Sequence, residues 1–424
     1  MKRSKLKLMG CSSWSADGSP APPLEERVGE RRPFGRGNQA WRGASLPWLL
    51  LLGLLSSFGP STAAESTREF VPGEIWRDTD GNPINAHGGG VLRHEGVYYW
   101  YGESKTGRTY LPDANKSWGG TRVDFSGVSC YTSTNLHDWK REGIVLAPVA
   151  GDESRDLAAS QVVERPKVIF NRTTKQFVMW MHIDSANYAA ARAGVAVSAA
   201  PAGPFKYLGS FRPNAGVWPE NASAEDRVPA RTNHLARDFE AGQMARDSTL
   251  FVDDDGQAYH FYSSEENPTM HVSLLTPDYL RPAGKYRRIF IGRSMEAPAV
   301  FKRQGKYYFI GSGCTAWAPN PARCAVADSP WGPWRELGNP CVGEEADTTF
   351  RSQGTFVLEV AEAEPAFIFI ADRWNQWDLA DSRYVWLPLE FSAEGKPVIR
   401  HRERWSLMPT RRTAQAVGAG QGGR

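Results

Sequence analysis

The sequence predicts an all-β fold, a five-bladed β-propeller, from two patterns that recur along the chain. In the first, a tight turn leads into an aromatic-rich strand, as in GVYYWYGES from Gly96 and GKYYFIGSG from Gly305. In the second, a strand ends in a polar turn, as in CYTSTNLHDW from Cys130. Five such units cannot bury their faces alone, so we expect five sheets that converge on a central axis.

The two patterns alternate in a regular order. The first begins at Gly96, Lys175, Gly256, Gly305 and Pro365, and the second begins at Cys130, Val195, Met270, Cys324 and Leu387. The apolar runs are short and bounded by turn residues, which favours strands over helices. Blades of about 65–70 residues fill residues 65–410 as one domain.

Residues 1–64 differ in composition from the rest and are interpreted as a leader with a signal peptide. A Leu-rich apolar segment at about 46–58 follows Arg42 and precedes a small-residue cleavage position at Ala63 or Ala64. A bilayer-spanning helix needs about 20 apolar residues, which favours cleavage over retention. We expect a secreted or periplasmic protein with no stable membrane insertion, and an anchor formed by an uncleaved N-terminal segment is the alternative.

The charge balance argues against a nucleic-acid partner. Nine of the 50 Lys and Arg residues lie in the leader, so the remainder carries 41 basic and 43 acidic residues. The folded part therefore has no basic excess. Residues 411–424 are predicted to be a disordered tail, and we expect a monomer.

Two acidic residues at the starts of strands are candidates for glycosidic chemistry. Glu296 precedes a strand beside Pro298 and apolar neighbours, which would raise its pKa toward that of a general acid. Asp247 holds the equivalent position one blade earlier and could tune that acid. A Glu in a surface loop is the plainer reading of Glu296 when it is taken alone.

The segments around these residues resemble glycoside hydrolase family 43. RDSTLFVDDDGQAYHFYSS and SMEAPAVFKRQGKYYFIGSGCTAWAPN resemble two catalytic segments of that family, and NAHGGGVLRHEGVYYWYGE matches its exo-β-1,3-galactanase branch, also called galactan 1,3-β-galactosidases. The likeness spans residues 72–408. It implies a five-bladed propeller and an inverting glycoside hydrolase, with Glu296 as the acid and Asp247 beside it.

The chain departs from the wider family at the expected general base. Most members carry an Asp in an Ala-Asp-Pro setting, whereas this chain has Ala86, His87 and Gly88. In the galactanase branch, the resemblance implies that Gln353 and Glu164 act around the nucleophilic water. Gln353 would position that water or act through an imidic tautomer, Glu164 could be the base itself, and His87 is a third alternative.

Sugar binding needs aromatic faces and planar polar groups. The candidates lie where the aromatic-rich strands, interpreted as inner strands, emerge; they are Glu103, Asp184, Tyr188, Trp317, Asp372, Arg373 and Trp374. Trp100 and Tyr101 are further candidates for stacking on a sugar ring. The long stretch 212–245 is expected to overhang the mouth of the axis and to alter the preference for substrate length.

The predicted function is release of galactose from the ends of β-1,3-galactan, such as arabinogalactan backbones. An arabinofuranosidase or xylosidase on the same fold, or an inactive carbohydrate-binding propeller, is the alternative. No nucleotide loop and no zinc-like cysteine spacing is present, so no cofactor is required and no metal ligand is named. The resemblance is compatible with a structural Ca²⁺ in the axis.

Overall fold

The computed structural model describes residues 68–409 except 116–118 and 361–362. The predicted leader (1–64) with its signal peptide and the predicted tail (411–424) lie outside the described residues, so cleavage, export and disorder stay predictions. Within the described ranges, no helix combines the length and the apolar character that a membrane crossing requires.

Blades I and II each contain four antiparallel strands. Blade I consists of β1 (His87–His94), β2 (Val97–Glu103), β5 (Val128–Ser133) and β6 (Lys140–Leu146). Blade II consists of β7 (Val162–Asn171), β8 (Gln176–Asp184), β9 (Arg192–Ser198) and β10 (Lys206–Phe211).

Blades III and IV repeat this arrangement. Blade III consists of β11 (Ser248–Val252), β12 (Ala258–Ser264), β13 (Thr269–Leu275) and β14 (Pro282–Ile289). Blade IV consists of β15 (Met295–Arg303), β16 (Lys306–Gly313), β17 (Arg323–Ala327) and β18 (Arg335–Gly338).

Blade V has five strands, because a short strand pairs in parallel with its outer edge. Its strands are β20 (Gln353–Glu359), β22 (Phe367–Arg373), β23 (Arg383–Phe391), β24 (Pro397–Arg400) and the added β19 (Cys341–Val342). Two small ribbons pair β3 (Thr109–Tyr110) with β4 (Arg122–Val123) and β21 (Ala363–Glu364) with β25 (Met408–Pro409). The short helices are η1 (Glu225–Arg227), α1 (His234–Arg237), η2 (Ala346–Thr348) and η3 (Leu379–Asp381).

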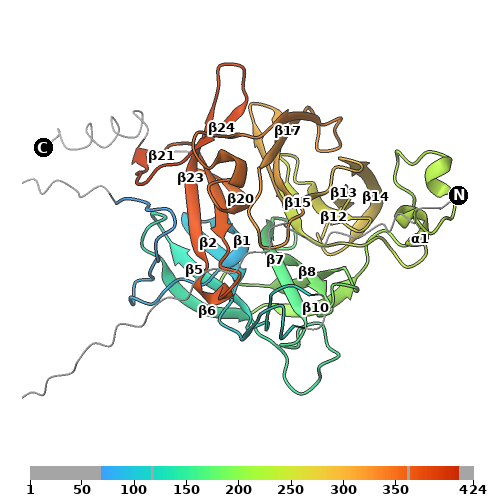
Figure 1. The fold of residues 1–424 in the computed structure, drawn as a ribbon, viewed down its shortest axis with the longest axis horizontal. Coiled ribbons are helices and arrows are strands. Elements are labelled where there is room, and N and C mark those ends of the chain that lie inside the picture. The colour runs from blue at the N-terminus through green and yellow to red at the C-terminus, as the bar shows by residue number, and fades with distance from the viewer. Residues whose placement is uncertain (1–67, 116–118, 361–362, 410–424) are drawn as a thin grey trace, which may run out of the picture. The chain divides into compact units, whose positions relative to one another are not determined.

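The inner strands close a ring around one axis. Each of β1, β7, β11, β15 and β20 contacts the inner strand of the next blade, and β20 contacts β1. In Figure 1, β1, β7, β15 and β20 lie in the middle of the blades. The prediction of an all-β, five-bladed propeller is therefore confirmed.

The aromatic-rich strands are the second strands of their blades, which corrects the interpretation that they line the axis. The pattern from Gly96 forms β2, and the pattern from Gly305 forms β16. Trp100 and Tyr101 on β2 are each 1% exposed. Successive residues of a strand point to opposite faces, so Trp100 packs toward blade V and Tyr101 packs toward blade II. The proposed stacking role of these two rings is wrong.

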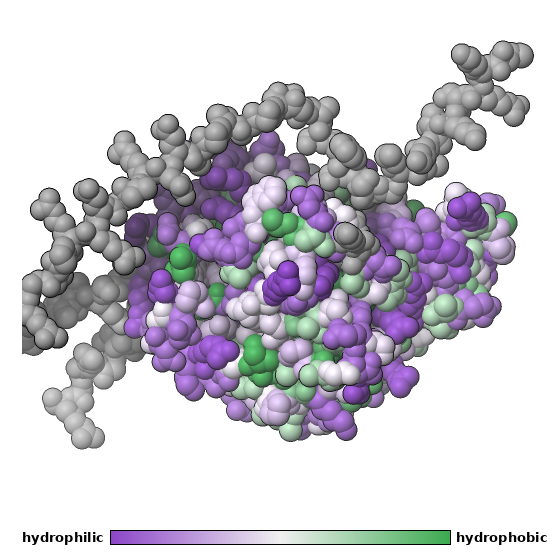
Figure 2. Space-filling view, turned by 60° about the horizontal axis from the view of Figure 1, so that its bottom comes forward, coloured by the Kyte–Doolittle hydropathy of each residue, from purple (hydrophilic) through white to green (hydrophobic). Residues whose placement is uncertain are grey.

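The hydrophobic core lies between neighbouring blades rather than on the axis. The richest interface closes the ring between blades V and I, where Trp100 and Trp139 pack against Trp386. Phe70 and Trp405, far apart in sequence, form a backbone bridge and stack with ring centroids 4.2 Å apart. Outside this core, the face shown in Figure 2 is mainly hydrophilic, with small scattered hydrophobic groups.

Four of the five inner strands contain a β-bulge at the start. In β1, β7 and β15, two residues face one on the neighbouring strand, after His87, Glu164 and Glu296 respectively. A shift of one residue also follows Gly354 in β20. A bulge re-aims side chains that would otherwise alternate across the sheet.

Carboxylates of neighbouring elements hold these bulges in place. In β1, β7 and β15, the first residue of the bulge has a positive φ: 61° at Gly88, 56° at Arg165 and 51° at Ala297. The N–H groups of these residues donate to carboxylates that precede them around the ring. The donor–acceptor pairs are Gly88 N to Asp372 Oδ2 at 3.0 Å, Arg165 N to Glu103 Oε1 at 2.9 Å and Ala297 N to Asp247 Oδ2 at 3.0 Å.

We predict that Gly88→Ala destabilises the protein more than Gly96→Ala does. Both glycines have positive φ, so each substitution costs about 1–2 kcal/mol of backbone strain. A Cβ at Gly88 would also come within 2.1 Å of Glu103 Oε1, whereas nothing lies within 4 Å of a Cβ at Gly96. We expect Gly88→Ala to cost about 3 kcal/mol or more in denaturant unfolding. Equal losses for the two variants would show that Glu103 moves aside freely.

Candidate active site

A polar residue stands at or near the start of every inner strand. His87 begins β1, Glu164 is the third residue of β7, Glu296 is the second of β15, and Gln353 begins β20. Asp247 directly precedes β11. The inner strands surround one axis, so these side chains meet at one end of it.

Arg165 connects these residues at the centre of the site. Its guanidinium is buried, with Nη2 2.9 Å from Asp247 Oδ2 and 2.6 Å from Gln353 Oε1. Nη1 has no hydrogen-bond partner among the described residues. A buried guanidinium N–H without a partner indicates that a ligand atom can bind there.

Glu296 is the carboxyl group most easily kept protonated. Burial, and then the negative charge of Asp247, raise its pKa to about 8. Asn267 Nδ2 donates to Glu296 Oε1 at 3.0 Å. Because Oε1 accepts this hydrogen bond, the other oxygen is the better position for the acid proton. Glu296 therefore has the protonation state that a general acid needs near neutral pH.

Glu164 has the opposite electrostatic environment. Burial alone would raise its pKa, but its contact with His182 and the charge of Lys105 lower the pKa to about 2. Burial also acts against the charged form of His182, yet Asp184 and Glu164 raise the pKa of His182 to about 9. Tyr188 donates its hydroxyl to Glu164 Oε1 at 2.9 Å. Two carboxyl groups with opposite pKa shifts in one site are typical of an acid and a base.

A pocket beside these carboxyls carries the aromatic and polar groups that a sugar needs. Glu103, Lys105, Glu164, Tyr188 and Trp317 are among its lining residues. Lys105 forms an ion pair with Glu103. Trp317 and Trp374 meet edge to face with centroids 5.1 Å apart, and Lys105 Nζ lies 5.2 Å and 5.5 Å from their respective centroids.

Solved structures with this architecture identify the family. A β-1,3-galactosidase of family GH43, BT3683, solved with galactodeoxynojirimycin, is 46% identical; the match covers 80% of this chain and 100% of that one, with a TM-score of 0.72. The family model for glycosyl hydrolases family 43 matches residues 228–396. The chain belongs to glycosyl hydrolase family 43.

Two other family 43 structures show similar agreement. An exo-β-1,3-galactanase from Phanerochaete chrysosporium with β-1,3-galactotriose is 35% identical over 80% of this chain and 68% of that one, with a TM-score of 0.65. An exo-β-1,3-galactanase from Clostridium thermocellum is 37% identical over 80% and 67%, also with a TM-score of 0.65. No curated protein matches the chain. The fold and these likenesses make the protein a glycoside hydrolase.

At the start of β1, where most family 43 members carry the general base, this chain has His87, whose ring is enclosed by protein groups. His87 is fully buried, its Nδ1 lies 2.9 Å from Asp372 Oδ1, and its ring stacks on Tyr384 with centroids 4.8 Å apart. The carboxylate of Glu103 fills the space beside Gly88. His87 therefore supports the start of β1 and is poorly placed to reach a water molecule.

Gln353 is held as an ordinary amide. Its Oε1 accepts hydrogen bonds from Arg165 Nη2 and from Trp374 Nε1 at 3.0 Å, and its Nε2 donates to Ser312 Oγ at 3.0 Å. An imidic tautomer would place an O–H group against two donors. The surroundings therefore favour a Gln353 that positions water or sugar through its remaining N–H over one that removes a proton.

Three other predicted binding residues make their polar contacts with the protein. Asp184 is 1% exposed and accepts hydrogen bonds from Ala190 N at 2.7 Å and from Ala191 N at 2.9 Å. Asp372 accepts from the Gly88 amide. Arg373 donates to Phe350 O at 3.0 Å. These contacts favour supporting roles for all three residues.

Sequence reasoning missed several residues that complete the site, namely Lys105, Arg165, His182, Asn267 and Ser312. One usable signal was the ERPK sequence beginning at Glu164, which places three charged groups at the start of a strand. A second charged residue in a buried strand requires a partner at the same depth. That argument would have directed attention to Arg165.

One group of described side chains has the proximity that a metal site needs, and its chemistry does not suit calcium. Ligand atoms of Glu164, His182 and Asp247 lie within 4.8 Å of one another. With a pKa of about 9, His182 is protonated at neutral pH and repels a cation. Calcium also prefers six to eight oxygen ligands. The expectation that no cofactor is required stays a prediction.

We predict that Asp247→Asn moves the alkaline limb of the pH–rate profile to lower pH. With Glu296 as the general acid, kcat/KM should fall as the pH rises through about 8. Removing the Asp247 charge lowers the pKa of Glu296, and the limb should move by about one pH unit. Asp255→Asn, an exposed change in the β11–β12 turn, is the control. An unchanged limb in Asp247→Asn would exclude this electrostatic coupling.

Proposed function

We propose that this glycoside hydrolase is an inverting, exo-acting β-1,3-galactosidase that releases galactose from β-1,3-galactan such as arabinogalactan backbones. The observation that carries the proposal is the pair of carboxyls with opposite pKa shifts, Glu296 and Glu164, both of which interact with the charge of Arg165. The printed names of the similar structures, which are β-1,3-galactosidases and exo-β-1,3-galactanases, support the substrate class.

In the proposed mechanism, hydrolysis takes place in one displacement. Glu296 gives its proton to the glycosidic oxygen while the bond from that oxygen to C1 breaks. A water molecule forms a new bond to C1 from the opposite face, and Glu164 accepts the proton that this water loses. The free N–H of Gln353 and Nη1 of Arg165 orient the water or the sugar hydroxyls. Glu296 ends as a carboxylate and Glu164 as a carboxylic acid, so charge and protons balance.

The galactose first released from the non-reducing end of β-1,3-galactotriose should be the α-anomer, and the reducing end then stays in the disaccharide product. Inversion at the β-linked C1 requires the α-anomer, and proton NMR can record the anomer before mutarotation equalises the two forms. Aryl arabinofuranoside and xyloside serve as specificity controls. Early β-galactose would refute inversion, release of arabinose or xylose alone would refute the galactosidase proposal, and binding without any release would indicate an inactive carbohydrate-binding propeller.

Azide should rescue Glu164→Ala but not Gln353→Ala. Loss of a general base should slow hydrolysis by about 10²–10⁴-fold. Azide is a nucleophile that carries no proton to remove, and the smaller side chain leaves room for it. Azide should therefore restore turnover in Glu164→Ala and yield α-galactosyl azide, which NMR can identify. Rescue confined to Gln353→Ala would transfer the role of base to Gln353.

A further inference from the structure

The turn that brings Asn267 to the general acid has an unfavourable backbone conformation. Glu265, Glu266 and Asn267 connect β12 to β13 with consecutive φ values of 54°, 61° and 69°. Non-glycine residues rarely adopt positive φ, so three in a row persist only where surrounding contacts hold them. The hydrogen bond from Asn267 to Glu296 therefore depends on whatever fixes this turn.

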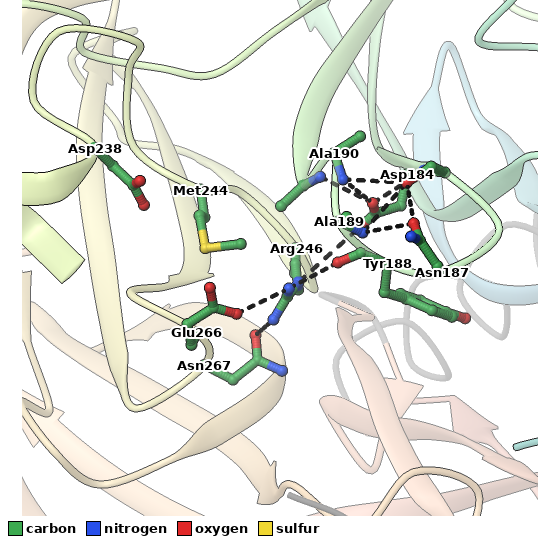
Figure 3. A network of polar contacts seen from close by, with 12 residues as sticks. Asp184, Asn187, Tyr188, Ala189, Ala190, Asp238, Met244, Arg246, Glu266 and Asn267 are labelled. Atoms are coloured by element: carbon green, nitrogen blue, oxygen red, sulfur yellow. Dashed lines mark hydrogen bonds and ion pairs between the residues drawn. The ribbon is translucent and has the colours of Figure 1, made fainter. Parts of the chain in front are cut away.

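Arg246, which precedes β11, holds this turn through two contacts of its guanidinium. Its Nη2 lies 3.2 Å from Glu266 Oε2, and its Nη1 lies 3.4 Å from Asn267 Oδ1. The same contact to Asn267 orients the amide, because Oδ1 faces the guanidinium and Nδ2 is left to face Glu296. Figure 3 shows Arg246 between this turn and the loop after β8.

The other contacts of Arg246 lead to the proposed base. Nη2 also donates to the carbonyl oxygen of Tyr188 at 2.8 Å, and Nε lies 3.8 Å from Asp184 Oδ2. Tyr188 has a positive φ of 56°, so its backbone also needs support. Its hydroxyl donates to Glu164. One guanidinium thus contacts the supports of both catalytic carboxyls (Figure 3).

We propose that Arg246 is a positioning residue that couples the placement of the general acid to that of the general base. It acts on Glu296 through Asn267 and on Glu164 through Tyr188. This inference rests on the proposed function for the roles of the two carboxyls. A planar guanidinium can direct N–H groups at several fixed acceptors at once, which a lysine ammonium on a flexible stem cannot do.

Arg237 provides a matched control. Its Nη1 lies 3.1 Å from Glu266 Oε1, the other oxygen of the carboxylate that Arg246 contacts. Arg237 is 37% exposed, compared with 14% for Arg246, and its recorded hydrogen bonds reach Asp238 and Met244 rather than Tyr188 or Asn267. Loss of Arg237 should leave the positions of both catalytic carboxyls unchanged.

The choice of leaving group separates the effect of Arg246 on Glu296 from its effect on Glu164. A sugar leaving group needs a proton from Glu296, whereas dinitrophenolate leaves without one, and both substrates need the base to activate water. We would measure kcat/KM on β-1,3-galactobiose and on dinitrophenyl β-galactoside, with thermal unfolding of every variant. The variants are Arg246→Met, Arg246→Lys, Asn267→Ala, Tyr188→Phe and Arg237→Met.

The expected pattern is specific to positioning. Asn267→Ala should lose about 10-fold or more on galactobiose and little on the aryl substrate, because only the acid is displaced. Tyr188→Phe should lose equally on both. Arg246→Met should lose on both, more on galactobiose, and Arg246→Lys should resemble it. Adding Asn267→Ala to Arg246→Met should cost little more on galactobiose, because the two act through one contact. Arg237→Met should stay within about twofold of wild type.

Three results would overturn the inference. They are a loss in Arg246→Met no larger than in Arg237→Met, the same loss on both substrates in every Arg246 variant, and full additivity with Asn267→Ala. If Arg246→Met does not fold, Glu266→Gln removes the exposed partner of Arg246 and should reproduce the pattern of Asn267→Ala. A Glu266→Gln variant that does not reproduce it would overturn the inference equally.

Wild-type cleavage of an arabinoside or xyloside alone would refute the proposed function, and the same variants would then be compared on that glycoside pair.

Discussion

The site depends on hydrogen bonds that join the carboxylate of one element to a bulged backbone N–H on the next inner strand. The bulges at Gly88, Arg165 and Ala297 turn side chains toward the axis, but each also exposes an N–H that no strand partner accepts. A buried N–H without a partner costs about 1–3 kcal/mol. Asp372, Glu103 and Asp247 remove that cost, so the ring geometry and the catalytic geometry rest on the same contacts.

These contacts also explain which carboxyl keeps a proton. Asp247 accepts a hydrogen bond from the Ala297 amide and forms an ion pair with the Arg165 guanidinium. Glu164 is stabilised as an anion by His182 and Lys105. Burial and the nearby Asp247 charge oppose the ionisation of Glu296, and the charge of Arg165 and the Cys314 thiol offset these effects only in part. The proton therefore resides on Glu296, the carboxyl with the least favourable surroundings for an anion.

The sequence was sufficient for the fold and for the residues named at the starts of inner strands. Turn chemistry and short apolar runs repeat in every blade, so the blade number could be predicted. The position of each strand within its blade could not, because the aromatic repeat marks the second strand and carries no information about distance from the axis. Arg165 was missed for a related reason. Regular alternation directs it away from Glu164, and a bulge that reverses this is set by tertiary contacts.

The altered start of β1 changes which blades supply the proposed acid and base. With His87 buried against Asp372 and Glu103 filling the space beside Gly88, blade I supplies a wall of the pocket instead of a base. The proposed base is therefore Glu164 on blade II, whose pKa is lowered to about 2, and the proposed acid Glu296 lies on blade IV. Blade III lies between them; Arg246 and Asp247 directly precede its inner strand β11, and Asn267 lies in the turn after its second strand β12. Blade III thus supplies the Asp247 charge that, after burial, raises the pKa of the proposed acid Glu296, whereas His182 of blade II and Lys105 keep the proposed base Glu164 ionised.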